Sequence, residues 1–348
     1  LILSGRLVSS KQAKKMGLVD ECIFERHFDR AIAHYVSSEP DIRRARNLEK
    51  IGNVDVFRFV IDKLIRRRLR NKILPEHYPA PFSVLDNWLE HGVTSNKAFA
   101  VEAKSIVQLF SSETAKNLLQ VYFLKEQLKG LTKTNKHLLH HVHVVGAGVM
   151  GGDIANLCAL QGFRVTLQDT NLEAIANTHK RASKLFYRRL KKPHLVQAAL
   201  DRLISDPKGY GISQADVIVE AIIEDKEQKQ ALFLNLQAKA KKKVLFATNT
   251  STIPLNEIVG KESPPMSLVG IHFFNPVSQM PLIEVVSDEK TSSPESVEKA
   301  MYFVGKLKKI PLPVKSSPGF LVNRLLLPYL MESMILLEEG IPASVIDS

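Results

Sequence analysis

Cysteine is scarce in this sequence, and long apolar runs are missing from it. The 348 residues include two cysteines, Cys22 and Cys158, which lie far apart. Small disulfide-stabilised secreted folds need more cysteines, so we predict a reducing compartment and no disulfide framework. No apolar stretch approaches the roughly 20 residues that cross a bilayer, so we predict no transmembrane segment. The first residues also lack the longer apolar core and the cleavage pattern of a signal peptide.

Negative charge is also in short supply. The chain has 36 acidic residues against 48 lysines and arginines, which gives a formal net charge of +12. Such an excess suits nucleic acid, a membrane surface or an anionic small molecule. The densest basic run, KLIRRRLRNK at 63–72, lacks the interleaved aromatic residues of a single-strand-binding surface. We therefore interpret this run as a solvated helix face or a contact for an acidic partner, and we predict neither nucleic-acid binding nor a metal site.

Two regions precede the part of the chain that is rich in β-forming residues. Residues 1–35 predict a helix that ends at Gly17, since glycine suits the left-handed position that stops a helix, followed by a short apolar strand. Residues 36–138 place apolar side chains at roughly i, i+3 and i+4 intervals, which predicts a helical connector. One proline-rich piece of this connector, within 75–81, is expected to be extended.

The second half of the chain predicts the main domain. Residues 139–313 alternate short β-rich runs with helical segments, which implies βαβ units. We therefore predict an α/β fold, a Rossmann-type doubly wound domain with a mostly parallel sheet. Residues 314–348 predict a mostly apolar helix opened by Ser317 and Pro318. A helix that is apolar nearly all round is buried in a bundle or a subunit interface, so this region is expected to start an all-α domain.

A glycine-rich turn points to a dinucleotide. The stretch VVGAGVMGGDIA places Gly146, Gly148 and Gly151 in G-x-G-x-x-G spacing, directly after an apolar β run and at the start of a helix. These glycines allow a tight turn, a close approach of the backbone to a pyrophosphate, and close packing of helix on strand. Asp169 ends the next β run, where a carboxylate accepts from the ribose hydroxyls and repels the 2′-phosphate of NADP. The pattern therefore predicts NAD.

Polar side chains also stand at the ends of later β runs, where Rossmann ligands lie. They are Glu220 in VIVEA, Asn249 and Ser251 in LFATNTS, and His272 and Asn275 in VGIHFFNP. Read alone, a histidine beside two phenylalanines is more often a packed core residue. Glu284 lies twelve residues after His272 in the next β run, and a strand–turn–strand return can bring it beside the imidazole. A carboxylate there fixes the tautomer and stabilises the charged form, which makes the histidine a better proton acceptor.

Several motifs, taken in order, resemble one family. The stretches GAGVMGGDIA, NTSTIP, GIHFFNPVSQMPLIEVV and SPGFLVNRLLLPYLMES look like those of the L-3-hydroxyacyl-CoA dehydrogenases, over about 140–348. Upstream, SGRLVSSKQAKKMGLVDECI resembles the end of a crotonase-type enoyl-CoA hydratase/isomerase domain. A hydratase tail, a helical connector and a dehydrogenase together resemble the alpha subunits of fatty-acid oxidation complexes. With no initiator Met, the chain is expected to be a fragment of such a multifunctional enzyme.

The resemblance implies roles for individual residues. His272 would take the proton from the C3 hydroxyl while hydride leaves C3 for NAD, with Glu284 paired to it, and Ser251 and Asn323 would bind the reacting oxygen. The residues expected to contact or order the cofactor are Gly146, Gly148, Met150, Gly151, Asp169, Glu220, Lys226, Ser251 and Asn275. Asp153 stands where the family has a small residue, so its charge near a pyrophosphate is expected to be mildly unfavourable.

The implied activity is oxidation of (3S)-3-hydroxyacyl-CoA to 3-oxoacyl-CoA in fatty-acid β-oxidation. Hydratase and isomerase activities are expected of the parent enzyme, whose hydratase carboxylates would lie upstream of Leu1. Most of the helical domain that closes over acyl-CoA would follow Ser348, so weak or no turnover is expected of these residues alone. The resemblance also implies a thiolase beta subunit, a homo- or hetero-oligomer, and a bacterial cytoplasm or a mitochondrial matrix. The alternative is a Rossmann protein that binds NAD without catalysis.

Overall fold

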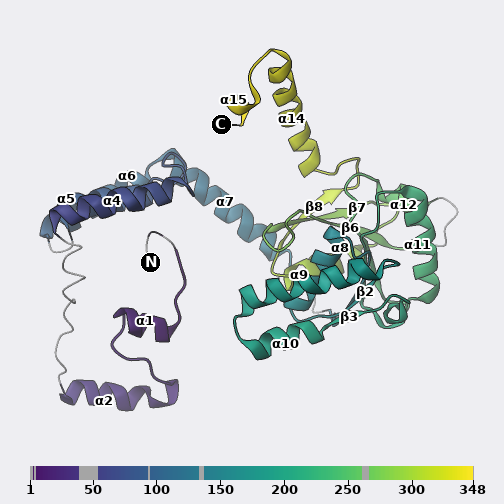
Figure 1. The fold of residues 1–348 in the computed structure, drawn as a ribbon, viewed down its shortest axis with the longest axis horizontal. Coiled ribbons are helices and arrows are strands. Elements are labelled where there is room, and N and C mark those ends of the chain that lie inside the picture. The colour runs from purple at the N-terminus through teal and green to yellow at the C-terminus, as the bar shows by residue number, and fades with distance from the viewer. Residues whose placement is uncertain are drawn as a thin grey trace. The chain divides into compact units, whose positions relative to one another are not determined.

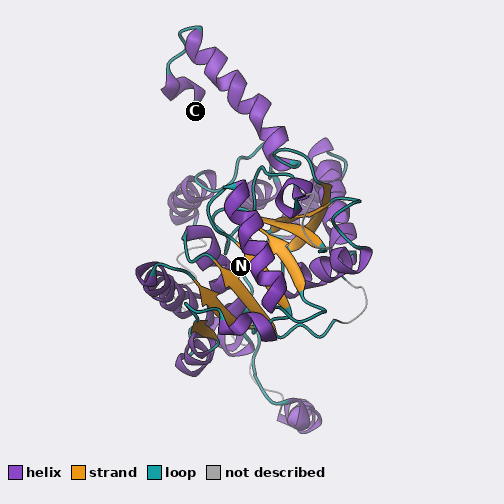
Figure 2. Ribbon diagram, turned by 90° about the vertical axis from the view of Figure 1, so that its right-hand side faces the viewer, coloured by secondary structure: helices purple, strands orange, loops and turns teal. Residues whose placement is uncertain are grey.

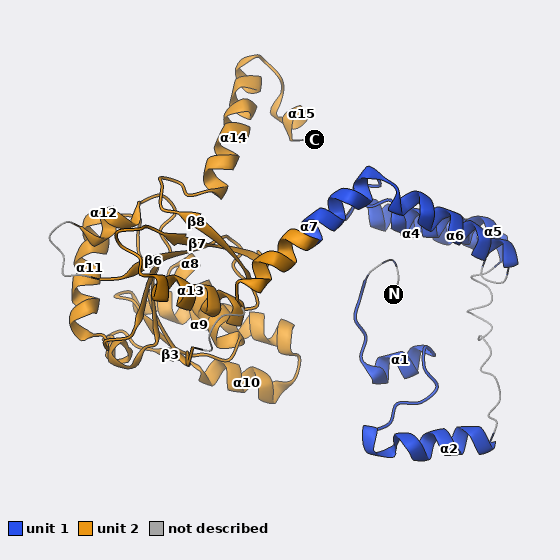
Figure 3. Ribbon diagram, turned by 180° about the vertical axis from the view of Figure 1, so that it is seen from behind, with its two compact units in different colours: residues 1–122 blue, residues 123–348 orange. Residues whose placement is uncertain are grey.

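A computed structural model describes residues 3, 5–38, 54–92, 95–132, 137–260 and 266–347 of the chain. The chain divides into two compact units, Leu1–Tyr122 and Phe123–Ser348 (Figure 3). The first unit is helical and the second contains the sheet. No helix in these ranges is both long enough and apolar enough to span a membrane. The same ranges hold no group of three or more histidine, cysteine, aspartate or glutamate side chains arranged to bind a metal ion.

The first unit is built from helices, as its apolar spacing predicts. They are α1 (Ser10–Met16), η2 (Glu25–His27), α2 (Phe28–Ser38), α4 (Asp55–Arg70), α5 (Ala80–His91), α6 (Asn96–Phe110) and the first part of α7 (Glu113–Gly130). Helix α1 begins with a capping box between Ser9 and Gln12, and it ends at Gly17, whose φ of 78° is left-handed as predicted. The strand predicted after Gly17 is wrong: residues 18–24 form turns and coil, because no described neighbouring strand offers a ladder.

Two further expectations for this unit have mixed outcomes. The basic run lies mostly on α4, where Arg67, Arg68 and Arg70 are exposed and Arg66 instead pairs with Asp62 on its own helix at 2.7 Å. The exposed side chains fit both readings of this run, a solvated helix face and a contact for an acidic partner. The expectation of an extended proline-rich piece within 75–81 is wrong, because residues 75–77 form a turn and Pro79 and Pro81 lie at the start of α5. Proline suits the first turn of a helix because that position needs no N–H donor.

The second unit contains an eight-stranded sheet in the order β3-β2-β1-β4-β5-β6-β7-β8. The strands are β1 (His141–Val145), β2 (Arg164–Gln168), β3 (Leu203–Ser205), β4 (Val217–Glu220), β5 (Leu245–Thr248), β6 (Leu268–Phe273), β7 (Leu282–Ser287) and β8 (Ile310–Lys315). The first six are parallel neighbours in the order of a dinucleotide-binding Rossmann fold, whereas β7 runs antiparallel to β6. The predicted doubly wound, mostly parallel α/β fold is confirmed.

Helices cover both faces of this sheet, with the strands between them (Figure 2). One core joins the sheet to α8 (Val149–Leu160), α9 (Leu172–Leu190), α10 (Pro193–Asp201) and α13 (Pro294–Lys306). The other core joins it to η3 (Tyr210–Gln214), α11 (Lys226–Lys239) and α12 (Leu255–Val259). Cys158 is fully buried in the first core and burial raises the pKa of its thiol, so it is the packed residue that its apolar helix suggests.

The last described elements are α14 (Val322–Glu338) and α15 (Ala343–Ile346), which follow the sheet (Figure 1). Helix α14 begins at Val322 rather than at Ser317 and Pro318, because Gly319 and Phe320 adopt left-handed backbone angles that are incompatible with an α-helix. Its apolar side chains are exposed, including Leu325 at 68% and Tyr329 at 70%. None of its described residues is buried within this chain, and the expected burial in a bundle or a subunit interface stays a prediction.

Candidate functional site

The glycine-rich turn joins β1 to α8. Gly146 has a φ of +104°, and a Cβ built on it would lie 2.4 Å from the carbonyl oxygen of Ala221. A Cβ on Gly151 would lie 2.0 Å from the carbonyl oxygen of Gly146. A Cβ on Gly148, in contrast, would meet no protein atom within 4 Å. Two glycines are therefore required by packing, and the third faces open space where a ligand backbone can approach the N-terminus of α8.

A cavity of about 580 Å³ lies beside this turn. Its lining includes Gly146, Gly148, Asp169, Thr170, Ile222 and Leu232. Asp169 follows β2, and its Oδ2 accepts a hydrogen bond from the backbone N–H of Ala147 at 2.6 Å. The carboxylate is thus held at the rim of the turn, where it can accept from ribose hydroxyls. The glycine turn, the helix N-terminus and this carboxylate together fit the adenosine and pyrophosphate of a dinucleotide.

The charge of Asp153 is compensated by a residue that the sequence did not single out. Arg181 on α9 donates from Nε to Asp153 Oδ1 at 3.0 Å, and its second terminal nitrogen donates to the carbonyl oxygen of Gly148 at 3.2 Å. The guanidinium therefore lies between the acidic side chain and the glycine turn. This contact offsets the unfavourable charge that we expected of Asp153 near a pyrophosphate.

His272 and Glu284 face each other across the only antiparallel pair of strands in the described sheet. The two residues are direct partners in the ladder, and His272 Nδ1 lies 2.7 Å from Glu284 Oε2. Both side chains are buried, with exposures of 4% and 0%. The imidazole also contacts the rings of Phe274 and Phe320, at centroid distances of 4.6 and 5.6 Å. Phe273, the other phenylalanine of the motif, packs in the core on the opposite face.

The second oxygen of Glu284 binds the start of the terminal helix. Oε1 accepts hydrogen bonds from the backbone N–H groups of Leu321 and Val322, at 3.0 and 2.8 Å. Burial alone would raise the pKa of this carboxyl, but the hydrogen bonds from His272 and from the two N–H groups lower it below its ordinary value. The carboxylate is therefore ionised near neutral pH, and it holds the imidazole and the N-terminus of α14 at once.

The terminal helix brings Asn323 to the loop after β5. Asn323 Nδ2 donates to the carbonyl oxygen of Ser251 at 3.3 Å, and Asn249 in the same loop accepts from the N–H of Phe273 at 2.9 Å. Loop and terminal helix thus meet beside His272, as the predicted roles of Ser251 and Asn323 require. Asn275 follows β6 and is exposed. The structure gathers these residues at one end of the sheet, and their roles stay predictions.

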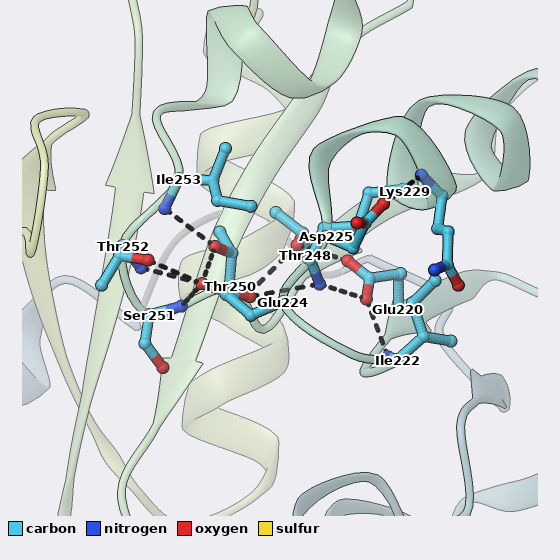
Figure 4. A network of polar contacts seen from close by, with 11 residues as sticks. Glu220, Ile222, Glu224, Asp225, Lys229, Thr248, Thr250, Ser251, Thr252 and Ile253 are labelled. Atoms are coloured by element: carbon cyan, nitrogen blue, oxygen red, sulfur yellow. Dashed lines mark hydrogen bonds and ion pairs between the residues drawn. The ribbon is translucent and has the colours of Figure 1, made fainter.

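Two predicted cofactor residues have partners within the protein, and their roles stay predictions. Glu220 is fully buried, and it accepts from Lys229 Nζ at 2.6 Å and from Thr248 Oγ1 at 2.6 Å (Figure 4). With both oxygens bound, this geometry gives no support to a contact with the nicotinamide ribose. Lys226 is exposed, and its Nζ lies 3.2 Å from Glu257 Oε2 on α12. Met150 is half-buried beside the glycine turn and packs against the core.

Sequence reasoning missed Glu224 and Lys229 at this site. The stretch EAIIEDKEQK, residues 220–229, holds four acidic residues and two lysines, and their order does not indicate which side chains face the sheet. In the structure Lys229 is 1% exposed and lies between Glu220 and Glu224, the latter at 3.4 Å. The available signal was weak: Lys229 lies within a turn of apolar positions on α11, whose buried side includes Phe233 and Leu236.

The fold and the glycine turn define a dinucleotide-binding Rossmann protein that carries a buried acid–base pair within strands β6 and β7. A family model described as the NAD-binding domain of 3-hydroxyacyl-CoA dehydrogenase matches residues 141–317, about half of the chain. The chain belongs to this family, and NAD is its cofactor. The predicted family, fold and cofactor are therefore confirmed.

Curated relatives resemble the whole chain. The fatty acid oxidation complex subunit alpha of Vibrio campbellii is 31% identical over 362 residues, which cover 100% of this chain and 51% of that protein. The protein of the same name in Shewanella loihica is 31% identical and covers 98% of this chain and 50% of its own length. The chain thus spans about half the length of the curated relatives it matches.

Solved structures resemble about 60% of the chain. The 3-hydroxybutyryl-CoA dehydrogenase of Escherichia coli K12 is 33% identical with a TM-score of 0.56, over 60% of this chain and 44% of that one. The (S)-3-hydroxybutyryl-CoA dehydrogenase of Ralstonia eutropha is 29% identical with a TM-score of 0.55, over 59% of this chain and 73% of that one.

Proposed function

We propose that this chain carries the dehydrogenase site of a β-oxidation enzyme, which oxidises (3S)-3-hydroxyacyl-CoA to 3-oxoacyl-CoA with NAD. The observation that carries the proposal is the buried His272–Glu284 pair, 2.7 Å apart, at the strand ends that face the cofactor site. A protein that only binds NAD needs no such pair. The same reaction class stands in the names of the solved relatives.

Each residue of the pair has a defined task in this reaction. The carboxylate of Glu284 holds the proton of His272 on Nδ1, which leaves Nε2 as the atom that takes the proton of the C3 hydroxyl. As the imidazole becomes positive, the ionised carboxylate at 2.7 Å stabilises the charge. The rings of Phe274 and Phe320 exclude water from the imidazole, which strengthens this attraction.

The remaining residues hold the reactants in line. NAD, when bound, accepts the hydrogen of C3 together with its electron pair. The turn from Gly146 to Gly151 holds the pyrophosphate, and Asp169 holds the adenosine ribose. Ser251 and Asn323 hydrogen-bond the oxygen at C3, and Asn275 orders the site around both ligands. Lys226 remains a candidate for a weaker cofactor contact. Such positioning is what a reversible transfer between bound partners needs.

The test follows NADH formation by the full-length protein on addition of a 3-hydroxyacyl-CoA. His272→Ala is expected to lower kcat/KM by about 10² to 10⁴, the usual contribution of a general base. His194→Ala, an exposed histidine on α10, is the matched control and is expected to retain activity. Equal rates in wild type and His272→Ala, or NAD binding with no turnover by wild type, would favour the alternative of a noncatalytic NAD-binding protein.

We also propose the arrangement of the longer protein. Residues 1–35 form the end of a crotonase-like hydratase/isomerase domain, 36–138 a helical connector, 139–313 the NAD-binding domain and 314–348 the start of the helical dehydrogenase domain. The names of the bacterial relatives support membership of a fatty acid oxidation complex. A thiolase beta subunit is then the expected partner, hydratase and isomerase activities belong to the parent enzyme, and the bacterial cytoplasm is the favoured compartment over a mitochondrial matrix.

A further inference from the structure

We propose that Glu224 is a positioning residue, whose carboxylate fixes the loop that presents Ser251 to the reacting oxygen. The inference rests on the proposed function, because it assigns Ser251 a place in that reaction. Glu224 lies in the segment between β4 and α11, and Ser251 lies in the loop that follows β5. The two segments are distant in sequence and lie side by side at the end of the sheet (Figure 4).

One oxygen of Glu224 collects the polar groups of this loop. Oε1 accepts from Thr250 Oγ1 at 2.6 Å, from the N–H of Ser251 at 2.8 Å, and from the N–H and Oγ1 of Thr252 at 3.0 and 3.1 Å. Thr250 Oγ1 in turn accepts from the N–H of Ile253 at 3.1 Å. Three consecutive residues of the loop are therefore fixed around one acceptor, and Ser251 is the middle one.

The hydroxyl of Ser251 is left for another partner by this arrangement. Its backbone N–H is bound by Glu224, and its backbone carbonyl accepts from Asn323 at 3.3 Å. In Figure 4 its side chain points away from the polar network, while Thr250 and Thr252 point their hydroxyls into it. Glu224 and Asn323 thus hold the backbone of Ser251 on both sides of its Cα atom, which limits the directions in which the hydroxyl can point.

Glu224 is itself held in place by an ion pair with buried Lys229. Lys229 lies 3.4 Å from Glu224 Oε2 and 2.6 Å from Glu220 Oε1. Glu220 Oε2 accepts from Thr248, which is the last residue of β5, at 2.6 Å. Burial raises the pKa of Glu224, but the bonds from Thr250 and Ser251 and the charge of Lys229 lower it below its ordinary value. The carboxylate is therefore ionised near neutral pH, and a neutral side chain cannot replace it without weakening the contacts to the loop.

A double-mutant cycle in the full-length protein tests the assignment. Glu224→Ala is expected to lower kcat by about 10²-fold, because a displacement of about 1 Å at a reacting group has that effect. Glu224→Gln, which keeps an acceptor and loses the charge, is expected to fall between wild type and Glu224→Ala. Glu227→Ala, which removes an exposed carboxylate from the first turn of α11, is expected to match wild type.

The decisive arm repeats Glu224→Ala in a Ser251→Ala background. If Glu224 acts through Ser251, the second substitution lowers kcat by less than about threefold, because coupled residues are not additive. Independent, multiplying effects would overturn the inference. An NAD dissociation constant that rises while kcat stays constant would also overturn it, since that result assigns Glu224 to the cofactor instead of the loop.

Amide hydrogen exchange separates this inference from the proposed function, because it needs no turnover. In Glu224→Ala and Glu224→Gln, exchange at Ser251 and Thr252 is expected to accelerate by about tenfold or more as their acceptor is weakened. The N–H of Phe273, held by Asn249 at 2.9 Å, is the internal reference and is expected to stay constant. Unchanged exchange at Ser251 and Thr252 refutes the positioning role. Accelerated exchange in a protein that never oxidises 3-hydroxyacyl-CoA refutes the proposed function alone.

Discussion

Replacement of Glu284 by glutamine is expected to invert the tautomer of His272. The carboxylate has two acceptors, one for Nδ1–H of the imidazole and one for the N–H groups of Leu321 and Val322. A glutamine has one carbonyl oxygen and one NH₂ group of nearly the same shape. Two backbone N–H groups outnumber one imidazole, so the carbonyl oxygen turns toward α14 and the NH₂ group turns toward His272. Nδ1 must then accept, and the proton moves to Nε2.

The inverted tautomer removes the base but leaves most of the fold. With a proton on Nε2, His272 has no free lone pair for the C3 hydroxyl, so kcat is expected to fall by about 10² to 10⁴. Three charged hydrogen bonds become neutral or are rearranged, which costs about 1–2 kcal/mol of stability. For a unit of this size that corresponds to a fall in Tm of about 2–8 °C.

Glu284→Ala gives the contrast that makes the comparison informative. It leaves three donors without an acceptor, the N–H of the buried imidazole among them, so the loss of stability is expected to be about 3 kcal/mol or more, and Tm is expected to fall by about 6 °C or more. Glu289→Ala, at an exposed site after β7, is the control for both variants. The rate of NADH formation and the melting temperature are measured for each protein. A Glu284→Gln protein with wild-type kcat would refute the tautomer argument, and a Glu284→Ala protein as stable as Glu289→Ala would refute the anchoring of α14.

Three further predictions concern the cofactor site and the acid limb of stability. Gly151→Ala is expected to weaken NAD binding by at least about tenfold and to destabilise by about 1–3 kcal/mol, since its Cβ would lie 2.0 Å from the carbonyl oxygen of Gly146; calorimetric titration and melting check this. Asp169→Ala is expected to weaken NAD about tenfold and to narrow the preference over NADP, and equal discrimination in both proteins would contradict its role. The pKa values of Glu284 and Asp216 are both lowered in the folded chain, in each case by hydrogen bonds that outweigh burial. These carboxylates therefore stabilise the fold above about pH 4, and that stability is lost as the pH falls through their folded values. Acid unfolding followed by circular dichroism is expected to be shallower in Glu284→Gln.

The sequence was sufficient for the parts of the fold in which local pattern and final environment agree. The six β runs predicted within 139–313 are all strands, because five of them are buried parallel strands with mostly apolar side chains and the sixth, β7, is buried beside β6. The sequence did not predict the elements whose structure depends on neighbouring strands or on backbone angles. Strand β8 carries Pro311 and Pro313, which local rules disfavour in a strand, yet it forms as the edge of the sheet beside β7. Strand β3 has three residues, too few for a pattern. The start of α14 depends on the left-handed backbone angles of Gly319 and Phe320. The apolar sequence around them gives no sign of a turn.

For the site, sequence spacing predicted that His272 and Glu284 lie together but did not predict the other hydrogen-bond partners of the acidic side chains. The distance of twelve residues between His272 and Glu284 was enough to expect a return of the chain, and the ladder places the two opposite each other. The second task of Glu284, at the start of α14, has no sequence signal, because backbone N–H groups look alike in every residue. The position of Glu220 at the end of β4 predicts a cofactor contact, but in the structure Glu220 pairs with buried Lys229, and Glu224 faces the loop after β5.

Because β7 runs antiparallel to β6, the distance between His272 and Glu284 depends on the register in which these two strands pair. Because His272 and Glu284 are ladder partners, backbone hydrogen bonds of β6 and β7 set their separation, and no ligand has to draw them together. A slip of one residue would turn Glu284 to the other face of the sheet and bring an apolar neighbour, Ile283 or Val285, opposite the imidazole. In misregistered copies of this hairpin, His272 would hence have no carboxylate partner to fix its tautomer. Any selection for the proposed reaction would therefore also select for accurate pairing of β6 with β7.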